Sequence, residues 1–148
     1  MKYFDTTFII KLYLREHGSK EVITLANRSG GLACSDLGYT EFHAALHRNL
    51  RDGTVNRRQF EQVLDRFTED CEIGQWHWIP ITRDVHEATA TTFRTIPGTL
   101  FLRCADAIHL STAKLHGFAE ICTNDRHLSN AASHFGMIVN NPISARET

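Results

Sequence analysis

Four acidic residues occupy positions where a carboxylate can do chemistry. Asp5 and Asp125 each follow a short apolar run typical of a buried strand, and each stands just before a helical pattern. Glu41 and Asp106 lie within helical patterns, among small and apolar residues where solvated acids are uncommon. Asp is also a poor residue for a helix interior, because its side chain competes for backbone hydrogen bonds.

Carboxylates gathered in one crevice need protons or cations. At an effective dielectric near 20, each pair of charges about 4 Å apart costs about 4 kcal/mol. Oxygen ligands without a set of His and Cys favour Mg²⁺ or Mn²⁺ over zinc. Two such ions held by carboxylates, with water retained, are a known apparatus for phosphodiester hydrolysis. If the four acids meet, they therefore predict metal-dependent hydrolysis of a phosphodiester.

Each acid also has a structural interpretation when taken alone. Asp5 and Asp125 are both suited to cap the N-terminus of the helix that follows. Asp106 has Arg103 three residues before it and is open to a simple ion pair. His109 shares the face of Asp106; we expect polar packing in the core, with orientation of a carboxylate as the alternative.

The elements that must position these residues alternate between strand and helix. Apolar runs predict strands at 3–4, 32–34, 76–81, 120–123 and 137–139, and helical spacing predicts helices over 6–16, 19–28, 36–51, 54–72, 82–96 and 104–116, with another beginning at Asp125. Thr54 is the expected cap of the fourth helix, and residues 36–72 are expected to form a helical hairpin. This alternation predicts a parallel sheet with helices on both faces. If the first and fourth strands are neighbours where strand order reverses, Asp5 and Asp125 face one crevice.

Length and composition predict one soluble domain over residues 1–148. Hydrophobic residues make up 42% and charged residues 22%, which is enough apolar material for a core and excludes a disordered chain. The net charge of −1 excludes a globally basic nucleic-acid binder. No membrane span or signal segment is evident, so we expect a cytoplasmic location. The four cysteines form no close pair, and we expect them to be reduced core residues and not zinc ligands.

Four stretches of the chain resemble the acidic motifs of the PIN domain family. They are Asp5-Thr6-Thr7, the helix around Glu41, Leu-Arg-Cys-Ala-Asp-Ala-Ile-His-Leu around Asp106, and Thr123-Asn124-Asp125-Arg126-His127-Leu128. The acids stand in the family's order and at family-like spacing over essentially the whole chain. Within the family, the chain is most similar to VapC-type toxins, which are single-domain ribonucleases partnered with a VapB-type antitoxin.

The resemblance implies a fold, a site and a reaction. The fold would be a three-layer α/β/α sandwich with a central, parallel sheet of about five strands. The catalytic, metal-binding residues would be Asp5, Glu41, Asp106 and Asp125, holding one or two Mg²⁺ or Mn²⁺ ions, with Thr6, Thr7 and Thr123 contacting metal-bound water. A metal-activated water would cleave RNA, leaving a 3′-hydroxyl and a 5′-phosphate. The substrate would be transfer or ribosomal RNA, and the toxin would form a homodimer.

Basic residues and an apolar face are candidates for contacts with partners. Arg48, Arg51, Arg57 and Arg58 cluster at the expected hairpin tip, and with His127 they are candidates to contact RNA; the alternative is a solvated charged face. The apolar face of the first two helices is a candidate for the antitoxin. It comprises Phe8, Leu12, Tyr13, Val22 and Leu25.

Three other interpretations compete with the nuclease. A receiver-like signalling domain would want a lysine at the end of its last strand, where the chain reads Met-Ile-Val-Asn-Asn-Pro. A haloacid-dehalogenase-like phosphatase would want a second acid two residues after Asp5, where Thr7 stands. The third is a catalytically silent PIN-like module that binds RNA or protein. Retention of all four acids favours the enzyme over this module.

Overall fold

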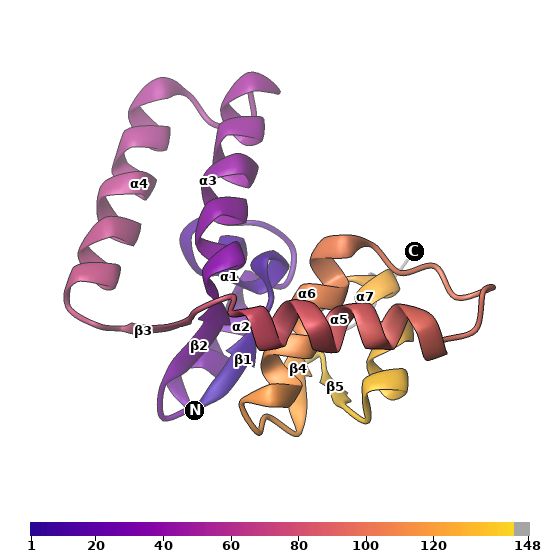
Figure 1. Cartoon of the computed structure of the whole chain (residues 1–148). Helices are drawn as coiled ribbons and strands as arrows, with labels where there is room; N and C mark the ends of the chain where they lie inside the picture. The colour runs from indigo at the N-terminus through magenta and orange to yellow at the C-terminus, as the bar shows by residue number, and fades with distance from the viewer. Residues whose placement is uncertain (144–148) are drawn as a thin grey trace.

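A five-stranded parallel sheet forms the middle layer of the protein (Figure 1). The structure is a computed structural model that describes residues 1–143. The strands are β1 (Lys2–Phe4), β2 (Leu32–Ser35), β3 (Trp76–Ile79), β4 (Glu120–Cys122) and β5 (Ile138–Asn140), in the spatial order β3-β2-β1-β4-β5. All neighbouring pairs are parallel, which confirms the predicted fold class.

Within residues 1–143, seven helices and one short 3₁₀ turn form the outer layers. They are α1 (Thr6–Tyr13), α2 (Ser19–Asn27), α3 (Asp36–Arg51), α4 (Arg57–Glu72), α5 (Arg83–Thr95), α6 (Cys104–Leu115) and α7 (Arg126–Ala132), followed by η1 (Ser133–Phe135). Because parallel crossovers are right-handed, α1–α4 lie on one face of the sheet and α5–α7 on the other. The contacts agree, since α1 packs on α2 and α3, whereas α6 packs on α5 and α7. The hairpin of α3 and α4 projects from the body (Figure 1).

The start of α4 differs from the sequence prediction. The helix is capped by Asn56 and not by Thr54, because Asn56 accepts a hydrogen bond from Gln59 N–H while the Gln59 side chain accepts one from Asn56 N–H. This reciprocal capping box satisfies two backbone donors, so the helix begins two residues later than expected.

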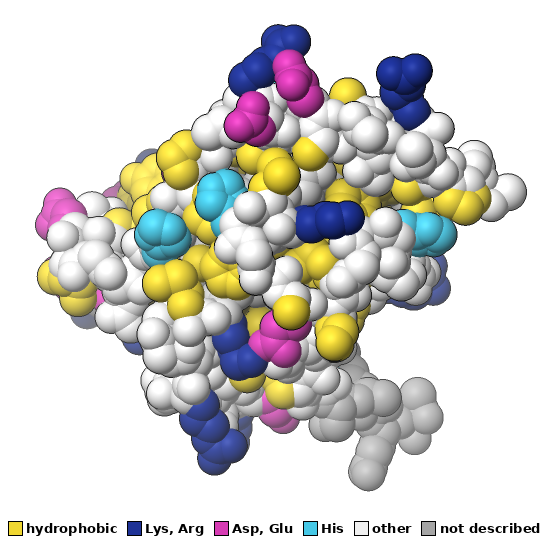
Figure 2. Space-filling view, turned by 60° about the horizontal axis from the view of Figure 1, so that its bottom comes forward, with side chains coloured by type: hydrophobic (Ala, Val, Ile, Leu, Met, Phe, Trp, Pro, Cys, Tyr) yellow, Lys and Arg dark blue, Asp and Glu magenta, His cyan; other side chains and the backbone are white. Residues whose placement is uncertain are grey.

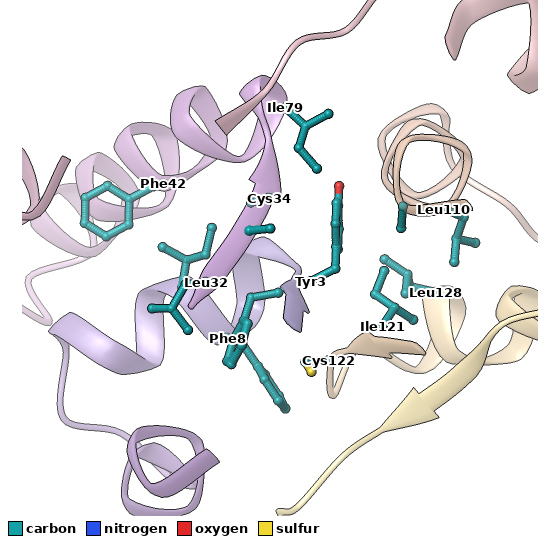
Figure 3. Close-up of a cluster of buried hydrophobic side chains, with 14 of the residues drawn as sticks. Tyr3, Phe8, Leu32, Cys34, Phe42, Ile79, Leu110, Ile121, Cys122 and Leu128 are labelled. Atoms are coloured by element: carbon teal, nitrogen blue, oxygen red, sulfur yellow. The ribbon is translucent and has the colours of Figure 1, made fainter. Parts of the chain in front are cut away.

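The core joins strand side chains to helices on both faces of the sheet (Figure 3). Tyr3, Phe4 and Ile121 are completely buried, and so are Phe8 of α1 and Leu110 of α6. The expectation of four core cysteines is wrong for one of them: Cys34 and Cys122 are buried and Cys71 is half-buried, but Cys104 is exposed. Cys104 is the first residue of α6, which presents it to solvent ahead of the buried part of that helix.

A glycine lets α3 lie close to the sheet. A Cβ atom added at Gly38 would lie 2.3 Å from Cys34 Sγ and 3.4 Å from Ile9 Cδ1. The first is far inside contact distance, so only glycine allows this approach of α3 to β2 and α1. The close approach matters because Glu41 lies one turn further along α3.

The apolar face of the first two helices is mostly used within the protein. Phe8 and Val22 are completely buried, and Leu12, Tyr13 and Leu25 pack against the core as partly buried side chains. These five residues therefore do not form the exposed groove that the sequence suggested.

The surface carries mixed charge. On the face in Figure 2, Lys and Arg side chains stand singly or in small groups among apolar and acidic ones and do not merge into a continuous basic surface. Among residues 1–143, no helix combines the length and apolar character that crossing a bilayer requires.

Candidate active site

Strand order reverses between β1 and β4, the central pair of the sheet. The two strands are parallel neighbours, with Tyr3 opposite Ile121 and Phe4 opposite Cys122. From β1 the chain crosses to β2, and from β4 it crosses to β5 on the other side. In open α/β sheets such a point is where ligands bind, beyond the carboxyl ends of the strands. Asp5 lies there directly, and Asp125 follows β4 closely.

A cavity of about 710 Å³ lies at this switch point, and all four candidate acids line it. Asp5 follows β1, Glu41 lies in α3 and Asp106 lies in α6. Asp125 is the residue that caps α7. Residues remote in sequence thus meet in one place. Other lining residues include Lys11, Arg48, Arg103, His109, Asn124 and Arg126.

Asp5 is buried and held by hydrogen bonds to both oxygens. Thr7 Oγ1 donates to Oδ1 at 2.7 Å and Thr123 Oγ1 donates to Oδ2 at 2.6 Å. The N–H of Phe8 also donates to Oδ1, so Asp5 is the N-cap of α1 as well as a cavity residue. Burial raises the pKa of Asp5 to about 6, although the Thr123 and Thr7 hydroxyls act in the opposite direction.

Thr123 links two of the acids directly. Its hydroxyl is fully buried; it donates to Asp5 and accepts a hydrogen bond of 2.9 Å from Asp125 N–H. Loss of this hydroxyl would leave Asp5 Oδ2 and Asp125 N–H without a hydrogen-bond partner among residues 1–143.

Glu41 receives two hydrogen bonds on one oxygen. Thr6 Oγ1 donates to Oε2, and His109 Nε2 lies 2.8 Å from the same atom. Partial burial would raise the pKa of Glu41, but the interactions with His109, Thr6 and Arg103 outweigh it and hold the pKa below its usual value. His109 therefore contacts Glu41, from another helix, and orients a carboxylate in addition to packing in the core.

Arg103 binds the remaining two acids. Its Nε and Nη2 donate to the two oxygens of Asp106 at 2.7 and 3.0 Å, and Nη2 also donates to Asp125 Oδ2 at 2.7 Å. The expected ion pair of Asp106 is thus present, and it extends to a second acid. Partial burial would raise the pKa of Asp125, but hydrogen bonds from Leu128 N–H and Arg103 lower it below its usual value.

The donor set around the cavity fits a hard divalent cation. Four carboxylates with hydroxyls beside them are the oxygen ligands that Mg²⁺ and Mn²⁺ prefer. The raised pKa of Asp5 marks a buried charge that a cation would stabilise. However, in residues 1–143 no three His, Cys, Asp or Glu side chains converge closely enough to hold an ion as they stand. Binding would therefore need side-chain adjustment, starting with the Arg103 contacts.

The predicted basic residues are only partly at the cavity. Arg48 lines it, whereas Arg51, Arg57 and Arg58 do not. Arg51 pairs with Asp52 and Arg57 with Glu61, on the hairpin. The solvated-face interpretation therefore suits these two better. The ring of His127 lies 4.5 Å, between centroids, from the exposed ring of Phe101 at the α5–α6 connection.

Two cations that line the cavity, Lys11 and Arg126, were not candidates from the sequence. A third, Arg103, was considered only as a partner of Asp106. Arg126 directly follows Asp125, a signal that was available in the sequence. Lys11 is almost fully buried and pairs with Glu16, which only the fold reveals.

A family model and several solved structures match this chain. The family model described as PIN domain matches residues 2–133. A search of curated proteins gives no match. Among solved structures, FitAcB from Neisseria gonorrhoeae superposes with a TM-score of 0.74 at 19% identity, covering 96% of this chain and 98% of that chain. A toxin-antitoxin complex from Klebsiella pneumoniae superposes with a TM-score of 0.65 at 19% identity, covering 98% of this chain and 100% of that chain. VapBC2 from Rickettsia felis, bound to a promoter DNA fragment, superposes with a TM-score of 0.66 at 15% identity, covering 95% of this chain and 98% of that chain.

Proposed function

The chain belongs to the PIN domain family, and we propose that it is a metal-dependent endoribonuclease and the toxin of a type II toxin–antitoxin system. Residues 1–148 would act as one nuclease domain in the cytoplasm. The observation that carries the proposal is the convergence of four carboxylates, from four elements, on one cavity at the switch point of the sheet. A helix cap accounts for Asp5 and Asp125 singly, but not for the arrival of Glu41 and Asp106 at the same cavity.

The acids would hold one or two Mg²⁺ or Mn²⁺ ions. The chemistry that such an ion supplies is activation of a water and neutralisation of charge at the phosphate. Thr7 and Thr123 fix both oxygens of Asp5, while Thr6 and His109 fix one oxygen of Glu41. Each acid so held keeps its place without reorganisation during the reaction, which lowers the barrier.

Cations on the cavity wall would bind the RNA backbone. Arg48 and Arg126 line the cavity beside the acids and offer guanidinium groups to phosphates. His127, with Phe101 against it, would lie at the edge of the same site. Transfer and ribosomal RNA loops are the proposed substrates, since unpaired bases are what proteins recognise most readily in RNA.

The proposed partners are a VapB-type antitoxin and a second copy of the toxin. Support comes from two solved structures of similar fold, of which one is a toxin-antitoxin complex and the other is VapBC2 bound to a promoter DNA fragment. Coexpression with a candidate antitoxin encoded beside this chain should abolish RNA cleavage and yield a stable complex in gel filtration.

RNA cleavage by purified protein tests the activity. Wild type should cut transfer or ribosomal RNA in Mg²⁺ or Mn²⁺ and stop in EDTA. Asp5→Asn should lower the rate by more than about 100-fold, because loss of an outer contact to a metal ligand alone costs about 10–100-fold. The matched control is Asp84→Asn, which changes an exposed aspartate in the first turn of α5 and should cleave like wild type. Equal cleavage by Asp5→Asn would exclude this site. Sequencing of cut RNA ends after brief expression would identify the substrate.

One observation favours the alternative of a catalytically silent PIN-like module. Arg103 already forms ion pairs with both Asp106 and Asp125, so these two acids have a partner within the chain. A silent module predicts RNA or protein binding with no cleavage in either metal. If folded wild-type protein binds RNA and leaves it intact in Mg²⁺ and in Mn²⁺, the enzyme proposal is wrong.

A further inference from the structure

A buried chain of hydrogen bonds leads from the backbone of β2 to Glu41. Ser35 N–H donates to Tyr3 Oη at 3.1 Å, and Tyr3 Oη lies 2.8 Å from His109 Nδ1. The other ring nitrogen, His109 Nε2, lies 2.8 Å from Glu41 Oε2. The four groups come from β2, β1, α6 and α3, so the chain runs between both helical layers across the sheet.

In this chain of hydrogen bonds, only the last member is exposed to water. Tyr3 and Ser35 have no exposed surface and His109 is 2% exposed, whereas the Glu41 side chain is 30% exposed. A buried polar group without a partner is costly, so each of these groups depends on its neighbour. The buried members therefore form a rigid support, and Glu41 is the one member that faces the cavity.

Hydrogen-bond donors and acceptors give the chain a direction. Ser35 N–H can only donate, so Tyr3 Oη accepts from it. In a neutral ring, a hydrogen donated by Tyr3 to Nδ1 leaves the ring proton on Nε2, which donates it to Glu41. Burial lowers the pKa of His109, but the interactions with Tyr3, Cys34 and Glu41 raise it well above its usual value, and a ring that carries both protons also donates from Nε2 to Glu41. The other polar neighbours of Nδ1 are farther away, with Ser35 Oγ at 3.5 Å and Cys34 Sγ at 3.9 Å.

Thr6 completes the support of Glu41. Its hydroxyl donates to Oε2, the oxygen that His109 also contacts. Both donors therefore fall on one oxygen, and Oε1 accepts no hydrogen bond from any residue in the range 1–143. The carboxylate is fixed on one side and keeps one oxygen for a ligand.

We propose that Tyr3 and His109 are positioning residues that hold Glu41 in the orientation needed to bind the divalent cation. This inference rests on the proposed function, because it gives Glu41 the role of a ligand. Outer partners that orient a ligand in this way are worth about 10–100-fold in metal affinity. A purely structural role for His109 predicts lower stability without this effect on the metal.

Mn²⁺ titration without RNA, by electron paramagnetic resonance or calorimetry, separates these roles. His109→Leu should weaken Mn²⁺ binding by about 10–100-fold. His109→Gln, whose amide can still donate to Glu41, should recover most of that loss. In the background of Glu41→Gln, His109→Leu should have no further effect, because both changes remove the same interaction.

Tyrosine variants provide a matched pair that perturbs the fold less. Tyr3→Phe removes the hydroxyl that holds the His109 ring through Nδ1, and it should weaken Mn²⁺ binding severalfold. Tyr13→Phe is the control, because Tyr13 Oη also has two partners, Asp70 and Trp76, but has no link to Glu41. It should bind Mn²⁺ like wild type. The nitrogen resonances of His109 in metal-free protein should show a proton on Nε2.

The outcomes are distinguishable. If Glu41→Gln leaves Mn²⁺ binding unchanged, the proposed metal site itself is wrong. If Glu41→Gln weakens binding but Tyr3→Phe and both His109 variants bind like wild type, only the positioning role is overturned. A neutral His109 ring protonated on Nδ1 would also overturn it. Should His109→Leu fail to fold, Tyr3→Phe compared with Tyr13→Phe still decides.

Discussion

Replacing Asp5 by Asn should stabilise the metal-free protein at neutral pH while abolishing RNA cleavage. Burial raises the pKa of Asp5 in the folded protein from 3.8 to about 6. The folded state therefore binds this proton more tightly than the unfolded chain does. As pH rises from about 4 to 7, the unfolded chain ionises first, and folded wild-type protein loses stability across that window.

The magnitude follows from the size of the shift. About two pKa units at 1.36 kcal/mol per unit correspond to about 3 kcal/mol that wild type loses and Asp5→Asn does not. Against this gain, the amide gives up the Thr123 hydrogen bond to Oδ2, worth about 1 kcal/mol. Asn caps helices as well as Asp does, so the bond from Phe8 N–H is kept. Relative to wild type, the free energy of unfolding of Asp5→Asn should therefore be higher by about 2 kcal/mol at pH 7 and lower by about 1 kcal/mol at pH 4.

Urea unfolding in EDTA at several pH values measures this difference. Asp125→Asn is the matched control, because Asp125 also caps a helix after a central strand. Its pKa is lowered in the folded protein, so its ionised form contributes stability above pH 3.8 that disappears at lower pH. Asp125→Asn should therefore destabilise the protein at pH 7, and less so in acid. If metal-free Asp5→Asn is less stable than wild type at pH 7, helix capping is the larger role of Asp5 and the reasoning from burial is wrong.

Three further predictions concern packing, charge and substrate. Gly38→Ala should destabilise the folded protein by about 1–3 kcal/mol, because the added Cβ meets Cys34 Sγ. In a double-mutant cycle measured by urea unfolding, Cys34→Ala should recover part of that loss. Arg103→Gln leaves two carboxylates without their ion pair, so it should lower the free energy of unfolding at pH 7 by about 1–2 kcal/mol, and by less in high salt. An unchanged urea midpoint would refute this. Arg48→Gln should weaken RNA binding and reduce the slope of log affinity against log salt by about one, whereas Arg57→Gln, outside the cavity, should not; equal slopes for both would argue against a cavity contact.

The fold was predictable because its signals are local. A short apolar run and an acid before a helix, at Asp5 and again at Asp125, indicate strand ends, and helical spacing indicates the layers between them. The sequence could not show that β1 and β4 are neighbours, which the meeting of Asp5 and Asp125 requires. The structure shows that the two strands pair. The start of α4 was misplaced because Thr54 and Asn56 are both good caps, and only Asn56 has Gln59 three residues later.

The site was only partly predictable because its contacts are long-range. Arg103 is three residues before Asp106, so that ion pair was visible, but its second bond, to Asp125, depends on the packing of α6 beside α7. The partnership of His109 with Glu41 joins residues 68 positions apart and has no sequence pattern. Arg51 and Arg57 were candidates for RNA contact or for a solvated charged face, and on the projecting hairpin they form ion pairs of their own.

The central position of β1 also sets the order in which the site is assembled during synthesis. β1 meets β2 through Lys2 and Leu32, early in the chain. Its other neighbour, β4, follows much later, and the bond between Asp5 and Thr123 joins residues 118 positions apart. Such distant contacts form last, because loop closure over a long stretch must come first. A ribosome-bound chain that ends before Thr123 therefore lacks both Asp125 and the hydroxyl that holds Asp5, and the proposed nuclease stays inactive until the residues after β4 have been made.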